Sequence, residues 1–234
     1  MTVTGIFYGV GVGPGDPELM TVKAWRLIST SPVIAYLAAN GGASSAREIA
    51  KPFLPEGAIE LAIDMPMRVE REPGEAAYDR GAEAIAEHLK SGRNVVMLCE
   101  GDPFFYGSFA YLFARLAKDY ETVVIPGVSS VTASAAAIGR PLAARNEVLK
   151  VLPATLEPQR LREELASAES AAIIKVGRHF SKVRDVLAVL NLTENALVIE
   201  KATRDEQHIA RVADIEGDTV PYFTTILVHA RRAA

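Results

Sequence analysis

The chain has 234 residues, 49% of them hydrophobic and 23% charged, a composition that excludes a largely disordered chain and allows a well-buried core. A formal net charge of −4 disfavours a polyanionic partner such as nucleic acid, and the longest apolar stretches fall far short of the ~20 residues needed to cross a bilayer. The single cysteine, Cys99, excludes an intrachain disulfide, and with no signal-like start we expect a soluble cytoplasmic protein.

In the first half of the chain, strand-like apolar runs alternate with segments whose apolar residues recur at helical spacing. Strands are predicted at residues 5–12, 31–37, 94–99 and 122–125. Helices are predicted at residues 22–28, 45–53, 75–89 and 109–116. Residues 64–74 mix prolines with charges of both signs, which predicts a long surface loop. Because strands alternate with helices, we expect a mainly parallel sheet with right-handed crossovers.

The character of the chain changes at Pro126-Gly127, where a helix rich in small residues is predicted to follow. Helices are predicted at residues 129–138, 157–167 and 180–191, and strands at residues 147–152, 171–176, 196–199 and 224–229. We therefore expect an α/β protein of two lobes. Residues 1–126 would form the lobe with the mainly parallel sheet, and residues 127–234 an α/β lobe with a mixed sheet.

Alternate glycines follow the first predicted strand: Gly9, Gly11, Gly13 and Gly15. A dinucleotide fingerprint needs glycines at i, i+2 and i+5, but Pro14 or Asp16 occupies the third position. A Walker loop would end in Gly-Lys-Ser/Thr, and the acidic Asp16 has the wrong charge for a pyrophosphate. The glycines indicate either a tight turn of purely structural importance or a site for a cationic or zwitterionic ligand.

A second motif, residues 99–108, follows a predicted strand directly, at the kind of strand end where open α/β sheets bind ligands. Gly101 would let the main chain approach a ligand, and Asp102 would project at the strand end. The alternative interpretation is an ordinary Gly-Asp-Pro turn followed by core aromatics. In a third motif, residues 126–130, Ser129 or Ser130 could cap the next helix or hold a polar ligand through its hydroxyl.

The three motifs, residues 10–21, 101–103 and 126–130, resemble those of the tetrapyrrole methylase family in order and separation. Within that family the chain is most similar to the precorrin-2 C20-methyltransferases of cobalamin biosynthesis. That similarity extends over residues 99–109, 139–143, 148–156, 175–179 and 221–223. Glu100, with Gly107 and Ser108, favours the metal-free substrate over its cobalt-containing counterpart.

The resemblance implies two α/β lobes, unrelated to the Rossmann methyltransferases, with S-adenosylmethionine bound in the cleft between them. It also implies a homodimer. Carried over by position, the residues expected to contact the donor are Pro14, Glu100, Gly101, Asp102, Phe105, Ser129, Ser130, Val176, Ala202 and Thr225. Ala202 departs from a glycine often found at its position, so its contact is the least secure of these.

The implied reaction is methyl transfer to C20 of precorrin-2, which gives precorrin-3A and S-adenosylhomocysteine. Attack by the C20 carbon leaves a cationic adduct that must lose a proton, and a carboxylate could accept that proton or stabilise the charge. Asp102 is the first candidate for this role and Tyr106 the second. Asp102 could instead only shape its loop or contact the donor.

Because precorrin-2 carries many carboxylates, cations should line the acceptor site. The candidates near motif ends are Arg140, Arg145, Lys175, Arg178 and Lys201, with Arg204 beside them. Arg68 and Arg71 lie on the long predicted loop, which could close over the substrate. For each cation, a solvated surface charge is the simpler interpretation. The histidines show no metal-ligand spacing, so no metal site is expected.

Three alternatives stay open. The same methylation could act on cobalt-factor II or at another corrin position. The chain could be a nucleotide-binding or regulatory module without turnover. A dinucleotide-dependent oxidoreductase is disfavoured by the glycine spacing and by Asp16.

Overall fold

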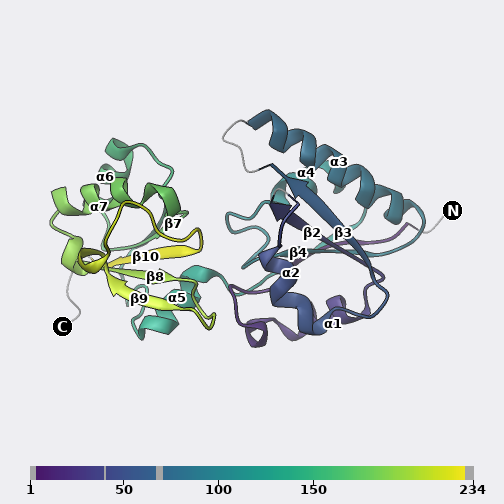
Figure 1. Ribbon diagram of the computed structural model, residues 1–234, viewed down its shortest axis with the longest axis horizontal. Coiled ribbons are helices and arrows are strands. Elements are labelled where there is room, and N and C mark those ends of the chain that lie inside the picture. The colour runs from purple at the N-terminus through teal and green to yellow at the C-terminus, as the bar shows by residue number, and fades with distance from the viewer. Residues whose placement is uncertain (1–3, 40, 67–70, 230–234) are drawn as a thin grey trace. The chain divides into compact units, whose positions relative to one another are not determined.

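The computed structural model describes residues 4–39, 41–66 and 71–229, with no side-chain description for residues 71–73. The chain divides into two compact units, Met1–Ser129 (unit 1) and Ser130–Ala234 (unit 2), a few residues beyond the expected boundary at Pro126. Both are α/β, as the sequence predicts (Figure 1). No helix within the described ranges is both long and apolar enough to span a membrane.

Unit 1 contains a five-stranded sheet in the order β3-β2-β4-β1-β5, and every strand pair in it is parallel. Its strands are β1 (Phe7–Gly11), β2 (Val33–Ala39), β3 (Ile59–Met65), β4 (Val95–Cys99) and β5 (Thr122–Ile125). The helices are α1 (Val22–Thr30), α2 (Ser45–Ala50), α3 (Arg71–Lys90) and α4 (Phe109–Leu116), with short 3₁₀ turns at Pro17–Leu19 and Lys51–Phe53. The central strand β4 is buried along its whole length, as expected for a parallel strand covered on both faces.

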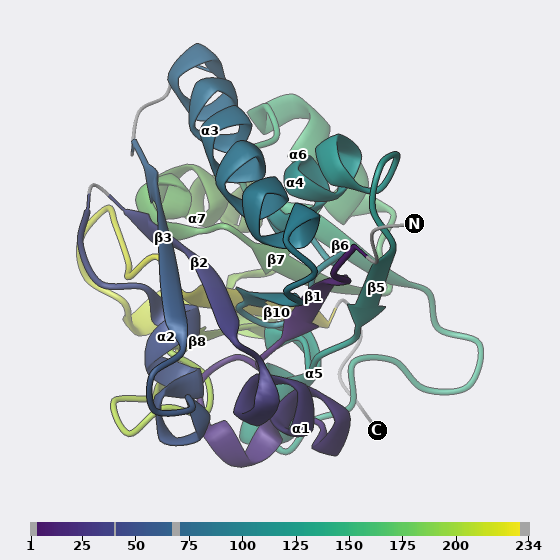
Figure 2. The same cartoon turned by 90° about the vertical axis from the view of Figure 1, so that its right-hand side faces the viewer.

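Helices cover both faces of this sheet. In Figure 2, α3 and α4 lie on one side of the strands and α1 and α2 on the other. On the α3–α4 side, Ile85 and Leu112 pack fully buried against the sheet, and Ile28 and Ile49 do the same from α1 and α2. Because the helices cover the two faces, the loops at the ends of the strands lie outside the layers, and sheets of this type bind ligands at the carboxyl ends.

Two predictions about unit 1 are wrong. Strand β3 is absent from the predicted elements, and the prediction of a loop at 64–74 is wrong at both ends, because β3 extends to Met65 and α3 begins at Arg71. β3 is an edge strand with mostly exposed residues, so burial gives it little apolar signal. Pro73 fits the first turn of α3, where its missing N–H would have no helical partner. Arg68 lies outside the described residues.

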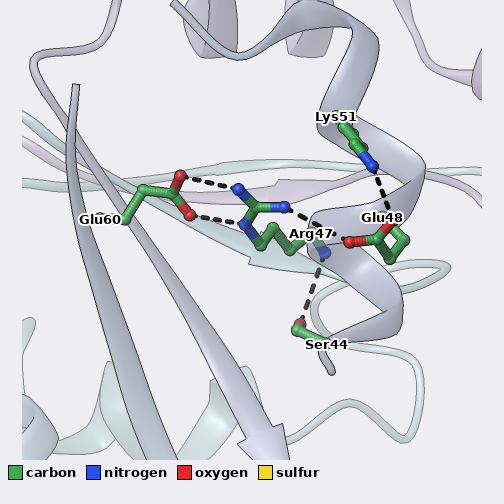
Figure 3. A network of polar contacts seen from close by, with 5 residues as sticks. All are labelled: Ser44, Arg47, Glu48, Lys51 and Glu60. Carbon is green, nitrogen blue, oxygen red and sulfur yellow. Dashed lines mark hydrogen bonds and ion pairs between the residues drawn. The ribbon is translucent and has the colours of Figure 1, made fainter. Parts of the chain in front are cut away.

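A polar network secures the edge strand β3 to α2 (Figure 3). Arg47 Nε and Nη2 donate to the two carboxylate oxygens of Glu60 at 2.6 and 2.9 Å. Glu48 lies 3.3 Å from Arg47 and 3.6 Å from Lys51. The hydrogen bond from Arg47 holds the pKa of Glu60 below its usual value of 4.5. β3 has only one strand neighbour, and this bidentate pair links it to α2 as well.

Unit 2 contains a mixed sheet in the order β6-β7-β10-β8-β9, in which only β6 and β7 pair in parallel. Its strands are β6 (Leu149–Pro153), β7 (Ser170–Ile174), β8 (Ala196–Glu200), β9 (His208–Arg211) and β10 (Thr224–His229). The helices are α5 (Ser130–Ile138), α6 (Pro158–Ala166) and α7 (Phe180–Val189), with 3₁₀ turns at Gly177–His179, Thr193–Asn195 and Val212–Asp214. Helices α6 and α7 pack on one face and α5 on the other. The edge strand β9, which is short and exposed, is not predicted from the sequence.

Candidate functional site

Three neighbouring strands of unit 1 end at one edge of its sheet. Because β4, β1 and β5 are adjacent and parallel, the segments that follow them emerge side by side. These segments are the three sequence motifs: residues 12–16 after β1, residues 100–108 after β4 and residues 126–129 after β5. The structure therefore brings the three motif turns together at the place where open α/β sheets bind ligands.

The first two turns are joined through their main chains. Val12 N donates to Cys99 O at 2.9 Å and Gly101 N to Gly13 O at 2.8 Å, and Gly13 and Gly101 form an isolated antiparallel bridge. Both glycines adopt left-handed φ values, +82° at Gly13 and +66° at Gly101, which side chains rarely tolerate. This requirement explains glycine at these two positions without reference to a phosphate.

The third turn touches the other two at Gly127. A Cβ placed on Gly127 would lie 2.0 Å from Gly101 O and 2.9 Å from Gly11 Cα. A Cβ on Gly11 would likewise lie 2.7 Å from Gly127 Cα. Backbone atoms cannot yield as a flexible side chain would, so any side chain at these two positions would push the turns apart. The turns of unit 1 form one backbone-lined surface.

Asp102 links the second turn to the third. Its Oδ1 accepts hydrogen bonds from Phe104 N at 2.9 Å and Phe105 N at 3.1 Å, and its Oδ2 accepts one from Gly127 N at 3.0 Å. The aspartate of the first motif, Asp16, caps the 3₁₀ turn at Pro17–Leu19 by accepting from Glu18 N at 2.8 Å. Both carboxylates are thus engaged by backbone N–H groups.

The three aromatic residues directly after Pro103 do not lie in the core, in contrast to the alternative interpretation of a turn followed by core aromatics. Phe104, Phe105 and Tyr106 are 53%, 39% and 45% exposed, whereas Phe109 is buried beneath them. Phe104 meets Phe113 edge to face with ring centroids 5.1 Å apart, and Tyr106 adopts a left-handed φ of 58°. Such a φ is uncommon outside glycine, and it presents an aromatic loop at the motif edge.

The remaining expected donor residues of this region lie beside the turns. Pro14 is buried, and Glu100 is partly exposed directly after β4. Ser129 and Ser130 are also partly exposed, with Ser129 immediately before the first residue of α5. The burial of Cys99 raises the pKa of its thiol, which keeps the sulfur protonated and unreactive.

In unit 2, the predicted residues that follow β7 and β8 share one sheet edge. Both strands pair antiparallel with β10, so they run in the same direction and end where β10 begins. This carboxyl edge of unit 2 carries Lys175, Val176, Arg178, Lys201, Ala202 and Thr225. Val176, Ala202 and Thr225 are buried there.

Both lysines of this edge have unusual backbones. Lys175 and Lys201 follow their strands with left-handed φ values of 57° and 47°. Lys201 N donates to Phe223 O at 2.7 Å, and the Arg204 guanidinium lies 4.8 Å from the centre of the Phe223 ring. Phe223 is not among the expected site residues, although the Pro-Tyr-Phe segment directly before β10 is one of those that carry the resemblance.

Arg140 and Arg145 do not join this edge. They lie in the segment between α5 and β6, where the neighbouring Pro141 O is 2.8 Å from His229 Nε2 and Leu142 O accepts a hydrogen bond from Ser170 Oγ. Ser170 begins β7 and His229 ends β10, so this segment lies at the opposite edge, roughly 13 Å away along the strands. The structure separates the five predicted acceptor cations into a group of three and a group of two.

His179 follows Arg178 at the carboxyl edge of unit 2. Burial and the nearby charges of Lys182 and Arg178 lower the pKa of His179, which favours its neutral form. Among the described residues, no three His, Cys, Asp or Glu side chains gather as metal ligands.

Comparison with known proteins identifies relatives for the whole chain. The sequence model of the Tetrapyrrole (Corrin/Porphyrin) Methylases matches residues 7–215. The chain is 42% identical to the cobalamin biosynthesis protein CobIJ of Mycobacterium tuberculosis, over 99% of this chain and 47% of that protein. It thus spans about half the length of this relative.

Two further relatives match over nearly their full length. The precorrin-2 C(20)-methyltransferase of Sinorhizobium sp is 38% identical, over 96% of this chain and 95% of that protein. The cobalt-precorrin-2 C(20)-methyltransferase of Salmonella typhimurium is 29% identical, over 97% of both.

Solved structures show the same fold. A cobalt precorrin-4 methyltransferase superimposes with a TM-score of 0.76 at 24% identity, covering 96% of this chain and 94% of its own. The uroporphyrin-III C-methyltransferase of Thermus thermophilus, in complex with S-adenosylhomocysteine, gives 0.68 at 22% identity, over 96% and 92%. The family match over most of the chain, the 38% identity to a full-length relative and the shared fold lead to one conclusion: this chain belongs to the tetrapyrrole (corrin/porphyrin) methylase family.

Proposed function

We propose that this chain transfers a methyl group from S-adenosylmethionine to C20 of precorrin-2, which gives precorrin-3A in cobalamin biosynthesis. The observation that carries the proposal is the contact of the three motif turns of unit 1, where a surface of glycine backbone and Asp102 meets the exposed loop 104–106. Family membership, and the 38% identity to a precorrin-2 C(20)-methyltransferase of the same length, support this reaction over others.

The backbone surface fits a bulky zwitterionic donor. Gly11 and Gly127 let the turns touch, whereas the Cβ position of Gly101 lies 3.9 Å from Val128 O, so a ligand can approach the main chain there. The donor residues of this proposal are Pro14, Glu100, Gly101, Asp102, Phe105, Ser129 and Ser130, with Val176, Ala202 and Thr225 from unit 2. S-adenosylmethionine supplies an activated methyl group, so the protein's main task is to hold the two reactants in line.

For the acceptor, we propose that the carboxyl edge of unit 2 binds precorrin-2 carboxylates through Lys175, Arg178 and Lys201. These cations lie on one edge, and Lys201 is only loosely paired, with Glu206 at 3.6 Å. Flexible ammonium groups suit carboxylates spread around a macrocycle. Arg140 and Arg145, at the opposite edge, are less suited to the same ligand.

The proton released from the methylated carbon needs an acceptor. Asp102 and Tyr106 are the candidates at the motif edge, and a carboxylate there could also stabilise the positive charge of the adduct. The resemblance further implies a homodimer, and the single cysteine favours a cytoplasmic location; we include both in the proposal. Sedimentation at several concentrations would measure the oligomeric state, and a monomer at every concentration would contradict the dimer.

A second candidate is methylation of cobalt-precorrin-2, because a cobalt-precorrin-2 C(20)-methyltransferase is also a full-length relative. Its lower identity, 29% against 38%, and the residues Glu100, Gly107 and Ser108 favour the metal-free acceptor. The dinucleotide alternative loses support, since Asp16 caps a helical turn at the position where a pyrophosphate would need donors.

The test is an assay without oxygen that offers both acceptors in parallel, with S-adenosylmethionine in excess. We expect S-adenosylhomocysteine to form only when a tetrapyrrole is present, and precorrin-2 to gain one methyl group by mass spectrometry. Exclusive turnover of the cobalt form would support the second candidate. Absence of turnover with either acceptor, despite donor binding, would favour a regulatory module, and saturable NAD(P)H binding would revive the oxidoreductase.

A further inference from the structure

Asp102 stands where the second and third motif turns of unit 1 meet. From its contacts we infer that Asp102 is a positioning residue, which locks these two turns into one surface, and is not the proton acceptor of the reaction. The inference rests on the proposed methyltransferase function, and it removes one of the two candidates for the base.

The carboxylate of Asp102 is already occupied. A carboxylate offers roughly four acceptor positions on its two oxygens. Three of them are filled by backbone N–H groups at 2.9, 3.1 and 3.0 Å, two on Oδ1 and one on Oδ2. A carboxylate that accepts a proton from a substrate must present a lone pair to that substrate, and Asp102 directs three of its roughly four lone pairs to the main chain instead.

The two oxygens act on different segments. Oδ1 closes a local turn with Phe104 N and Phe105 N, which sets the course of the exposed aromatic loop. Oδ2 reaches 25 positions along the chain to Gly127 N, in the turn after β5. Hydrogen bonds to an ionised acceptor belong to the strong class, so this side chain is suited to fixing both segments.

Gly127 depends on this bond because it has no side chain to hold it. Its position is limited by Gly101 O, only 2.0 Å from where a Cβ would lie, and by Gly11 Cα, 2.9 Å from the same point. Contact alone prevents the turn from moving inward, but does not prevent it from moving away. The bond from Gly127 N to Asp102 Oδ2 opposes that outward movement, and Ser129, an expected donor contact, follows two positions later.

This division of labour makes Asp102→Asn a selective probe. An asparagine keeps one oxygen for Phe104 N and Phe105 N, but its amide nitrogen would direct N–H donors at the N–H of Gly127. Asp102→Ser is the second variant, because a serine hydroxyl can form the local turn but is too short to reach Gly127. Asp119→Asn, in the exposed turn after α4, is the matched control for loss of one carboxylate charge.

Three measurements are made on the wild-type chain and each variant: amide hydrogen exchange, calorimetric binding of S-adenosylhomocysteine, and steady-state kinetics over pH. For Asp102→Asn we expect about tenfold faster exchange at Gly127, with much smaller changes at Phe104 and Phe105. The dissociation constant for S-adenosylhomocysteine should rise about tenfold, and the KM for the donor with it. At saturating donor, kcat should keep the wild-type pH profile. Asp119→Asn should match the wild type.

A proton acceptor would behave in the opposite way. If Asp102→Asn bound S-adenosylhomocysteine as tightly as the wild type, exchanged normally at Gly127 and lost kcat together with one limb of the pH profile, the inference would be overturned. Asp102→Ser decides by the same criteria if the asparagine variant does not fold. If the wild-type chain itself bound no S-adenosylhomocysteine, the proposed function would fail, while the exchange measurement would still report on the lock at Gly127.

Discussion

The carboxyl edges of the two sheets are built on different principles. In unit 1 the edge consists of main chain, in which glycines at positions 11, 101 and 127 touch each other and three backbone N–H groups donate to the carboxylate of Asp102. In unit 2 the corresponding edge presents long cationic side chains, and Lys175 and Lys201 hold their strained backbones without glycine. A main-chain surface is rigid and selects shape, whereas lysine side chains adapt to anions at several positions. In the proposed function, the main-chain turns of unit 1 therefore serve the donor, and the cationic side chains of unit 2 serve the acceptor.

The largest effect is expected from Gly127→Ala. The new Cβ would lie 2.0 Å from Gly101 O, so two backbone turns would have to separate. We expect binding of S-adenosylhomocysteine to become undetectable by calorimetry, and the free energy of unfolding to fall by about 2–3 kcal/mol in urea titrations, as overpacking predicts.

Gly74→Ala is the control for this change, because no atom of the described residues lies within 4 Å of its Cβ position in the first turn of α3. Its free energy of unfolding should stay within about 0.5 kcal/mol of the wild type. Normal donor binding by Gly127→Ala would mean that the close approach of the turns is unnecessary, and the distinction between the two edges would lose its basis.

An intermediate effect is expected from replacing both lysines by glycine, Lys175→Gly with Lys201→Gly. Glycine accepts the left-handed backbone at φ 57° and 47°, so the change removes the two charges without adding strain. We expect the KM for the tetrapyrrole to rise about tenfold or more, with the donor KM unchanged, because each lost charge contact is worth about 1 kcal/mol or more.

Glycine relieves backbone strain in the folded state of this double variant, but it also gives the unfolded chain more conformational freedom. Because these effects oppose each other, the free energy of unfolding should change by less than about 1 kcal/mol. Asn191→Gly, at φ 56° after α7, controls for the backbone change alone. An unchanged tetrapyrrole KM in the double variant would remove the acceptor role from this edge.

The smallest effect concerns stability in acid. Arg47 lowers the pKa of Glu60 from its ordinary value of 4.5, so the unfolded chain binds this proton more readily than the folded one. The stabilisation is fully present above about pH 4.5 and is lost as the pH falls through the lower folded value. Because the Glu60 side chain is 34% exposed, the pair contributes only about 0.5 kcal/mol.

The free energy of unfolding, measured by urea titration at pH 6 and in mild acid, should therefore fall less with decreasing pH for Glu60→Gln than for the wild type. Glu83→Gln, on an exposed position of α3, should retain the wild-type slope. If Glu60→Gln also retained that slope, the pair would contribute nothing measurable to holding the edge strand β3.

Much of the fold follows from local sequence. The strand β4 and the helix α4 are predicted nearly to the residue. β4 is a continuous apolar run because it is buried on both faces, and the buried residues of α4 recur at helical spacing. The edge strands β3 and β9 are missed because they are held by one neighbour and, for β3, by the Arg47–Glu60 pair. Their residues are mostly exposed, so the pattern that signals a strand is weak.

By itself, the sequence determined the two α/β halves, the order of the three motifs and, through them, the family. These features are encoded in residues close together along the chain, where periodicity and turn chemistry act. Only the tertiary structure decided that Asp102 bonds to Gly127, that Phe104 and its neighbours are exposed, and that Arg140 and Arg145 lie away from Lys175 and Lys201. Strand order and direction set these relations, because they determine which distant loops emerge at the same edge of a sheet.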